Sequence, residues 1–257
     1  MLQDINDVTS AHLASHDTVV HLAAVAHTHA TSDDDIWRCN VDGTRKLHRA
    51  ALEAGVGHFI FISSIKALAE SSDMPLTPDS MLAPEDVYGR SKHAAETYLA
   101  EANGPATSIV RIPLVYGDGV KGNFHTLERV AKLPLPLPFG GLTNKRSYVC
   151  VDNLCGAIEA IIRKPPEGYR VFHVADRETL SITEVLTIVR NAAGRSPSLF
   201  RLPLPLLTIL CELVLGRDRT FKLLGKLEMD IRETTRTLDW QPSITMSRYF
   251  DARSKSN

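Results

Sequence analysis

The chain has 257 residues, of which 44% are hydrophobic and 23% charged, so its composition is that of a globular protein and excludes disordered, collagen-like and coiled-coil chains. Its 29 Lys+Arg and 30 Asp+Glu residues give a formal net charge of -1, which lacks the basic excess typical of a nucleic-acid-binding protein. Four scattered cysteines without a C-x-x-C pair favour a reducing, cytoplasmic compartment over a secreted disulfide scaffold or a zinc site.

Strand and helix patterns alternate in the first half of the chain. Residues 18–24 and 59–62 are short apolar runs typical of buried parallel strands, and a helical stretch at 36–54 lies between them. A second helix is predicted at 86–103, followed by a third strand at 107–112. Alternating strands and helices of this kind predict an α/β fold, with a parallel sheet covered by helices on both faces.

The second half of the sequence is richer in glycine and proline at its start. After Pro113, glycines and the Leu-Pro repeats of 133–138 predict loops that face a substrate. The elements predicted beyond them are helices at 152–163, 181–193 and 204–215 and a short strand at 171–174. The apolar stretch 202–215 is too short to span a bilayer and, like the leucines of 223–227, is predicted to be core or dimer surface rather than lipid-binding. The C-terminal part is therefore expected to be small and mostly helical.

Three side chains point to proton chemistry. Tyr88 and Lys92 are four residues apart, on one face of a predicted helix, where an ammonium would favour the phenolate and lower the Tyr88 pKa. Ser64 follows a buried strand, at the sheet edge where open α/β folds bind ligands. The spacing of the tyrosine and the lysine alone is weak evidence for a catalytic pair, because about one chain in four of this composition contains it by chance. The alternative interpretation is an ordinary amphipathic helix. All three together predict a site that oxidises a hydroxyl or reduces a carbonyl.

Six ordered motifs resemble those of the extended short-chain dehydrogenases/reductases, and among them the NAD-dependent sugar-nucleotide epimerase/dehydratase family, most of all its UDP-glucose 4-epimerase-like members. They are His21-Leu-Ala-Ala24, Asn40-Val-Asp-Gly-Thr44, Phe61-Ile-Ser-Ser-Ile-Lys66, Tyr88-Gly-Arg-Ser-Lys92, Arg111-Ile-Pro-Leu-Val-Tyr-Gly117 and Arg146-Ser-Tyr-Val-Cys-Val-Asp-Asn153. The resemblance covers nearly the whole chain and implies a Rossmann-like NAD-binding domain at 1–113. It also implies a substrate-binding region at 114–257 that can interleave with the last strands of the sheet.

The resemblance implies roles for individual residues. Tyr88 would be the catalytic base, Lys92 its partner and a ligand of the nicotinamide ribose, and Ser64 the third catalytic residue. The further residues implied to bind the cofactor NAD are Asp4, Ile5, Leu22, Ala23, Ala24, Asn40 and Pro113. Those implied to bind the nucleotide-sugar substrate are Ser64, Tyr88, Asn123 and Arg146, the arginine because its planar guanidinium pairs with phosphate oxygens.

The implied function is NAD-dependent epimerisation of a UDP-hexose by transient oxidation of a sugar hydroxyl, in surface-polysaccharide biosynthesis. A homodimer is also implied, through the helix at 86–103. A sugar-nucleotide dehydratase or reductase stays as an alternative, although dehydratases usually carry acidic residues where Ile65 and Lys66 follow Ser64. A non-catalytic nucleotide-sugar-binding paralogue is the other alternative.

One part of the family pattern is missing. Relatives begin with a strand and a Gly-rich turn that holds the cofactor pyrophosphate, whereas this sequence starts near the end of the third strand, so we expect an N-terminal truncation of roughly 60 residues that removes the first βα units. Gly117-Asp-Gly-Val-Lys-Gly122 matches the dinucleotide pattern literally, but Pro113 interrupts its approach and no acidic residue follows at about 20 residues. We therefore assign that loop to substrate.

A metal site is not predicted. His27 and His29 lie near three aspartates at 33–35, but they lack a spaced third ligand. The aspartates are more simply the first turn of a helix, where negative charge complements the dipole.

Overall fold

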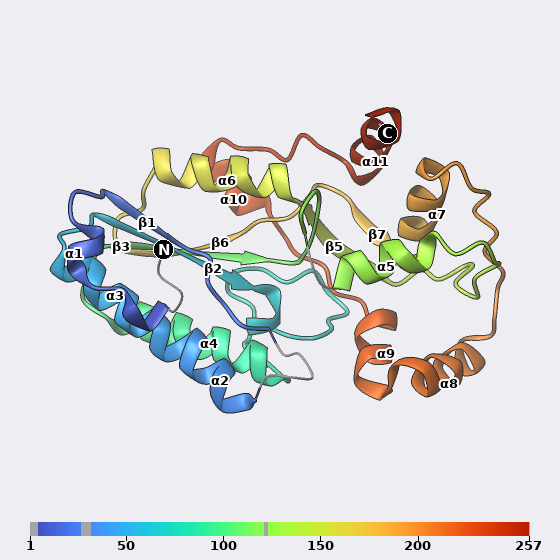
Figure 1. Ribbon diagram of the computed structural model, residues 1–257, viewed down its shortest axis with the longest axis horizontal. Coiled ribbons are helices and arrows are strands. Elements are labelled where there is room, and N and C mark those ends of the chain that lie inside the picture. The colour runs from blue at the N-terminus through green and yellow to red at the C-terminus, as the bar shows by residue number, and fades with distance from the viewer. Residues whose placement is uncertain (1–4, 27–31, 121–122, 257) are drawn as a thin grey trace.

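The computed structural model describes residues 5–26, 32–120 and 123–256 and contains a four-stranded and a three-stranded sheet (Figure 1). The larger sheet is parallel throughout, in the order β1-β2-β3-β6. Its strands are β1 Thr18–His21, β2 His58–Ser64, β3 Ala106–Ile112 and β6 Tyr169–His173. The predicted α/β fold with a parallel sheet is confirmed. Since β6 comes from the second half of the sequence, the division at residue 113 stays a prediction.

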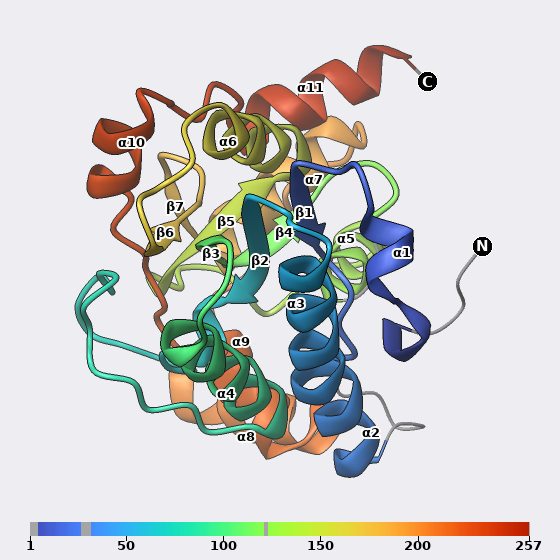
Figure 2. The same cartoon turned by 90° about the vertical axis from the view of Figure 1, so that its left-hand side faces the viewer.

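Helices cover both faces of this sheet (Figures 1 and 2). The first face carries α1 (Ser10–Leu13), α3 (Gly43–Glu53) and α4 (Val87–Glu101), and the other carries α6 (Val151–Arg163) and α10 (Arg232–Leu238). Every residue of β2 is buried, and alternate side chains enter different cores. Phe59 and Phe61 pack with α3 and α4, whereas Ile60 and Ile62 pack with α6.

The predicted helix at 36–54 is divided in the structure. It consists of α2 (Asp33–Trp37), a π-helical turn (Arg38–Asp42) and α3. The wider turn changes the direction in which Asn40 projects, and such turns are common at functional sites. The preceding strand also ends at His21 rather than at 24, which leaves Leu22 beyond the sheet edge.

The second sheet was not predicted from the sequence. Its strands are β4 Leu114–Tyr116, β5 Lys145–Cys150 and β7 Thr179–Ser181, so the segment after Pro113 contains short strands as well as loops. The helices packed with them are α5 Asn123–Ala131, α7 Ile182–Ala192 and α11 Met246–Ser256. These helices and strands share a core that includes the buried side chains of Tyr116, Tyr148 and Phe250.

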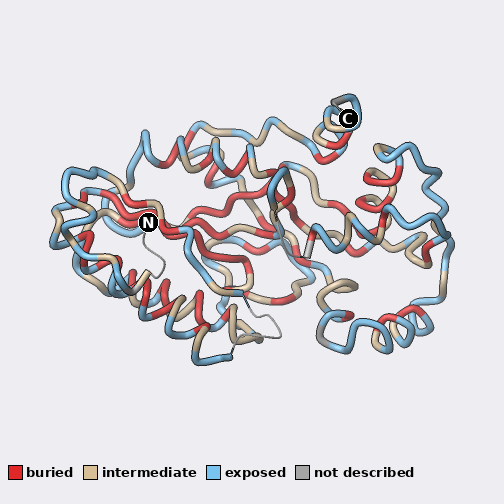
Figure 3. Tube along the Cα trace, viewed as in Figure 1, coloured by how far each residue is buried: buried red, intermediate tan, exposed pale blue. Residues whose placement is uncertain are grey.

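Two further helices, α8 (Leu204–Leu215) and α9 (Arg217–Leu224), form an arm beside this second core (Figure 1). Leu207 and Cys211 of α8 are buried, but most of its other apolar side chains are exposed, as the pale colour of this helix in Figure 3 shows. Most leucines of this segment therefore lie outside the core, and the alternative that they form a dimer surface stays a prediction. Among the residues described, no helix combines the length and the apolar character needed to cross a membrane.

Candidate active site

The carboxyl end of β2 and the amino end of α4 meet at the candidate site. Ser64 is the last residue of β2, and its Oγ accepts a hydrogen bond from the Lys66 backbone N–H at 3.2 Å. Tyr88 is half-buried in the first turn of α4, where its phenol lies close enough to Ser64 for the serine hydroxyl to lower its pKa. The structure thus brings together two of the three predicted catalytic side chains.

Local sequence explains why α4 begins here. Asp86 is the N-cap, and its carboxylate accepts a hydrogen bond from the Gly89 N–H at 2.7 Å. Gly89 is needed because the turn after β2 passes very close to it: a Cβ on this residue would lie 2.4 Å from the Lys66 carbonyl oxygen. The aspartate starts the helix and the glycine lets it approach β2, so that Tyr88 reaches Ser64.

Lys92 lies one helical turn beyond Tyr88 and is only 2% exposed. Its ammonium donates to the Ile62 carbonyl oxygen at 2.8 Å and lies 4.4 Å from the centre of the Phe61 ring. Burial lowers the Lys92 pKa to about 8, while the carboxylate of Glu96 acts in the opposite direction. One of the three ammonium protons is committed to the end of β2, next to Ser64.

The Tyr88 pKa departs from its predicted direction. Burial and the nearby Asp86 carboxylate raise it to about 12, and only the hydrogen bond with Ser64 lowers it. The spacing of Tyr88 and Lys92 led us to expect a lowered value, but the ammonium is directed to the backbone of β2. Spacing along a helix does not reveal how far burial opposes the phenolate.

Asn40 connects the segment after β1 to α4. Its side-chain amide accepts from the Val25 N–H at 2.7 Å and donates to the Val25 carbonyl at 2.9 Å. The same amide donates to Ser91 Oγ at 2.9 Å, and Ser91 in turn donates to the Tyr88 carbonyl at 2.8 Å. Asn40 therefore holds the segment after β1 against α4, and its implied role in binding NAD stays a prediction. Ser91 was not identified from the sequence.

The residues predicted to line the cofactor lie on an exposed surface next to this network, and their contact with NAD stays a prediction. Leu22 is 63% exposed, and the small side chains of Ala23 and Ala24 are exposed beside it. An apolar surface at the carboxyl end of a parallel strand, close to two hydroxyls and a buried ammonium, suits a flat ring and its ribose. Pro113 is buried after β3.

Two other predicted residues are less informative. Ile5 packs against the start of α3, where its side chain would lie 2.6 Å from a Cβ on Gly43. Asp4 lies outside the described residues. The predictions that they contact the adenine stay predictions.

Arg146, on β5, is half-buried and donates to the Gly225 carbonyl oxygen at 3.0 Å, directly after α9. Burial lowers its pKa, and the nearby Glu70 and Tyr148 act in the opposite direction. Asn123 is the first residue of α5, and its side chain lies outside what the structure describes. The structure thus places Arg146 beside the arm but leaves the pairing of these two residues as a prediction.

A charged cluster beside Tyr88 was missed by the sequence analysis. Asp86 accepts from Lys66 Nζ at 2.8 Å and from Lys222 Nζ, on α9, at 3.0 Å. Burial raises the Asp86 pKa, but the hydrogen bonds from Lys66 and the Gly89 N–H outweigh it and hold the pKa well below its usual range. Glu70, 3.3 Å from Lys66, has its pKa raised to about 7 by burial. The N-capping position of Asp86 could have revealed one member, but Lys222 is 136 residues away in sequence.

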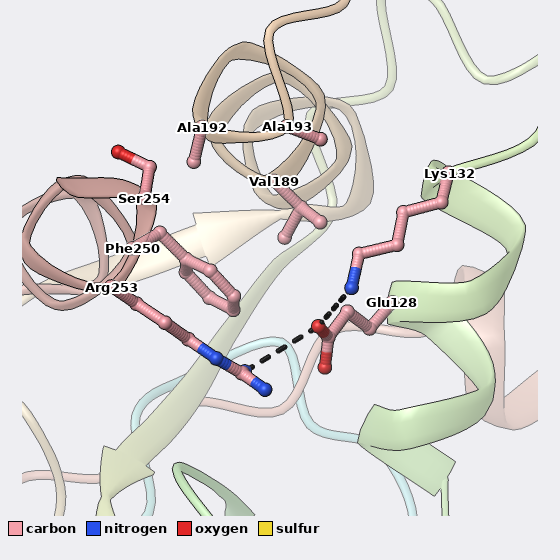
Figure 4. Close-up of a pocket in the computed structure, with 8 residues that line it drawn as sticks. All are labelled: Glu128, Lys132, Val189, Ala192, Ala193, Phe250, Arg253 and Ser254. Atoms are coloured by element: carbon pink, nitrogen blue, oxygen red, sulfur yellow. Dashed lines mark hydrogen bonds and ion pairs between the residues drawn. The ribbon is translucent and has the colours of Figure 1, made fainter. Parts of the chain in front are cut away.

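A small pocket lies elsewhere, among α5, α7 and α11 (Figure 4). Its charged groups are already paired, because Glu128 accepts from Lys132 at 2.6 Å and from Arg253 at 3.4 Å. Among the described residues no group of His, Cys, Asp and Glu side chains could hold a metal ion. His27 and His29, considered above as ligands, lie outside the described part of the chain.

Comparison with known proteins shows the family and supports the fold described above. Residues 2–175 match the model of the NAD dependent epimerase/dehydratase family. A UDP-glucose 4-epimerase from Vibrio cholerae is 37% identical over 264 residues, covering 96% of this chain and 79% of the relative. The crystal structure of a UDP-glucuronic acid 4-epimerase from Bacillus cereus in complex with NAD has a TM-score of 0.78 at 21% identity, covering 98% and 76% of the two chains.

The fold and site define an NAD-dependent enzyme with a Rossmann-like sheet. The chain belongs to the NAD dependent epimerase/dehydratase family, whose cofactor is NAD. A second relative is the N-acetyl-alpha-D-glucosaminyl-diphospho-ditrans,octacis-undecaprenol 4-epimerase of Escherichia coli O157:H7. It is 28% identical, and the alignment covers 76% of this chain and 60% of the relative.

Proposed function

We propose that the chain catalyses the NAD-dependent 4-epimerisation of a UDP-hexose. The observation that carries this proposal is the placement of Tyr88 and Ser64 side by side at the carboxyl end of β2, close enough for the Ser64 hydroxyl to lower the Tyr88 pKa, with the buried ammonium of Lys92 one turn behind. Such a pair can hold one sugar hydroxyl and exchange its proton. NAD, when bound, supplies an acceptor and then a donor of one hydride, so the cycle has no net oxidation.

Each residue has a defined task in this proposal. Tyr88 Oη takes the proton of the sugar hydroxyl, and Ser64 Oγ donates to the oxygen that becomes the carbonyl. The same proton returns from Tyr88 when the carbonyl is reduced on the opposite face. Lys92 binds the nicotinamide ribose, while Leu22, Ala23, Ala24 and Pro113 line the cofactor. Arg146 and Asn123 hold the diphosphate that anchors the sugar.

The direct test is to incubate the full chain with NAD and either UDP-glucose or UDP-galactose, and to separate the two sugars by chromatography. We expect interconversion in both directions without accumulation of reduced cofactor. Tyr88→Phe should lower the rate roughly 10²- to 10⁴-fold. Tyr98→Phe, in the same helix, is the matched control and should keep the rate. No interconversion, or full activity of Tyr88→Phe, would contradict the proposal.

The same assay separates the alternatives. Net consumption or production of reduced cofactor would favour a reductase, loss of water from the sugar a dehydratase, and substrate binding without turnover a non-catalytic paralogue. A second candidate is 4-epimerisation of a sugar whose diphosphate is carried by a lipid, because the 28% identical relative acts, by its name, on such a compound. A homodimer through α4 also stays a prediction, and light scattering tests it.

A further inference from the structure

The α8 helix presents an apolar face that the described part of the protein leaves open to solvent. The face consists of Leu206, Ile209, Leu210, Leu213 and Val214, which follow the spacing of one helical stripe. Leu213 and Val214 are 81% and 73% exposed. Leu207 and Cys211, which adjoin this face on the helix surface, are buried and attach the helix to the protein. A continuous exposed stripe of this kind marks a contact surface rather than scattered surface hydrophobics.

Positive charge surrounds the α8 apolar face. Between residues 200 and 226, five Lys or Arg residues stand against two acidic ones. One of the five, Lys222, is paired with Asp86, so its charge is balanced within the protein. Arg201 precedes the helix, and Arg217 and Arg219 follow it, all three exposed. Glu212 lies 3.8 Å from Arg217, and its charge is thereby partly balanced. An apolar stripe with basic residues at both ends complements an anionic lipid surface.

The same charges argue against a second copy of the chain. In a symmetric dimer this face would meet itself and bring the arginines at the helix ends close to those of the partner. Two aromatic side chains near this helix in the sequence, Phe200 before α8 and Phe221 on α9, are also about half exposed. In both ribbon views the arm lies at the lower edge of the molecule, where a flat surface could reach it (Figures 1 and 2).

We propose that the α8 apolar face docks the protein on the surface of an anionic membrane, without crossing it. The arm also touches the candidate site, since Lys222 of α9 contacts Asp86 and Arg146 donates to Gly225. Docking therefore places the site close to the lipid headgroups. This inference rests on the arm alone and stands whether or not the proposed UDP-hexose epimerisation is correct.

Flotation of the full chain with vesicles tests the proposal. With vesicles of about three parts phosphatidylcholine to one part phosphatidylglycerol, we expect the protein to rise with the lipid. Leu213→Gln/Val214→Gln should lower the partition coefficient about tenfold or more, because two large apolar side chains no longer enter the interface. Arg217→Gln/Arg219→Gln should lose the dependence on phosphatidylglycerol and salt.

Matched controls keep the result interpretable. Met81→Gln/Ile162→Gln changes exposed apolar residues elsewhere and should float like the parent protein. Unchanged thermal melting of Leu213→Gln/Val214→Gln shows that it is folded. A parent protein that stays at the bottom of the gradient, or a double variant that floats equally well, overturns the proposal. So does a parent dimer that this variant converts to a monomer. Flotation without epimerase activity would reject the proposed function only.

Discussion

The helices α4 and α8 depart in opposite directions from the usual distribution of polar and apolar residues. Among the buried side chains of α4 are Ser91, Lys92 and Glu96, and each has a hydrogen-bond or ion-pair partner. On α8 the apolar residues are outside. Buried polar groups and exposed apolar stripes are both costly, so each marks a segment with a task beyond folding. We propose that the task of α4 is to hold a reacting group and that the task of α8 is contact with another surface.

The largest effect on the buried polar contacts of α4 is expected when Arg111 is replaced. Its guanidinium donates to Glu96 at 2.7 Å, and both side chains are almost fully buried. Arg111→Met leaves Glu96 as an unpaired buried charge and should lower the free energy of unfolding by roughly 3–5 kcal/mol. Arg217→Met, on the exposed arm, is the control and should change it by less than about 0.5 kcal/mol. Denaturant titration measures the free energy of unfolding of both variants. Equal losses would contradict the difference between the buried contacts of α4 and the exposed arm.

The Lys92→Met variant distinguishes a catalytic role of this lysine from a structural one. The side chain keeps its volume but loses the ammonium, so we expect about a hundredfold lower kcat, or about 2.7 kcal/mol. Stability should not fall, because burial already disfavours the charge of this lysine, whose pKa is about 8. Lys46→Met, exposed on α3, should leave kcat unchanged. Loss of stability with normal kcat would assign Lys92 a structural role instead.

Glu70 predicts a pH dependence of stability. Its folded pKa is raised from 4.5 to about 7, so the folded protein holds a proton that the unfolded chain releases. The stabilising contribution is full below pH 4.5 and is lost as the pH rises through about 7. Glu70→Gln should therefore be more stable than the parent at pH 8, by at most about 3 kcal/mol, and the difference should close toward pH 4.5. Thermal melting at both pH values checks this sign.

The smallest effect is expected on the open side of α8. Leu206→Gln changes an exposed member of the α8 apolar face and should alter the free energy of unfolding by less than about 0.5 kcal/mol. Its neighbour Leu207 is buried, and Leu207→Ala should cost roughly 2–5 kcal/mol. If Leu206→Gln destabilises the isolated protein as strongly, the face is covered within the fold.

The elements around the site were accessible from the sequence because their signals are local. The apolar run of β2, the N-terminal cap and length of α4, and the limits of α8 follow from residues that are neighbours in the chain. The second sheet was missed because β4 is three residues long and pairs Leu114 with Tyr148, far along the sequence. The π-helical turn before α3 was missed because apolar spacing does not distinguish it from an α-helix.

Some features of the candidate site could likewise be predicted from local sequence, and others could not. Ser64, Tyr88 and Lys92 could be proposed from one strand end and one helix turn. The ion pair of Asp86 with Lys222 could not, because its two residues are 136 positions apart and no local pattern links them. The direction of the Tyr88 pKa also depends on burial and on Asp86, which spacing along α4 does not contain.

The close contact at Gly89 restricts how this protein can be altered in the laboratory. Any side chain at this position must displace the backbone after β2, because the Lys66 carbonyl oxygen would lie 2.4 Å from the new Cβ. Library designs that aim at new sugar specificity should therefore keep residue 89 fixed, even though it bears no functional group. Diversity is better placed at exposed positions such as Leu114, where side chains can change without separating Tyr88 from Ser64.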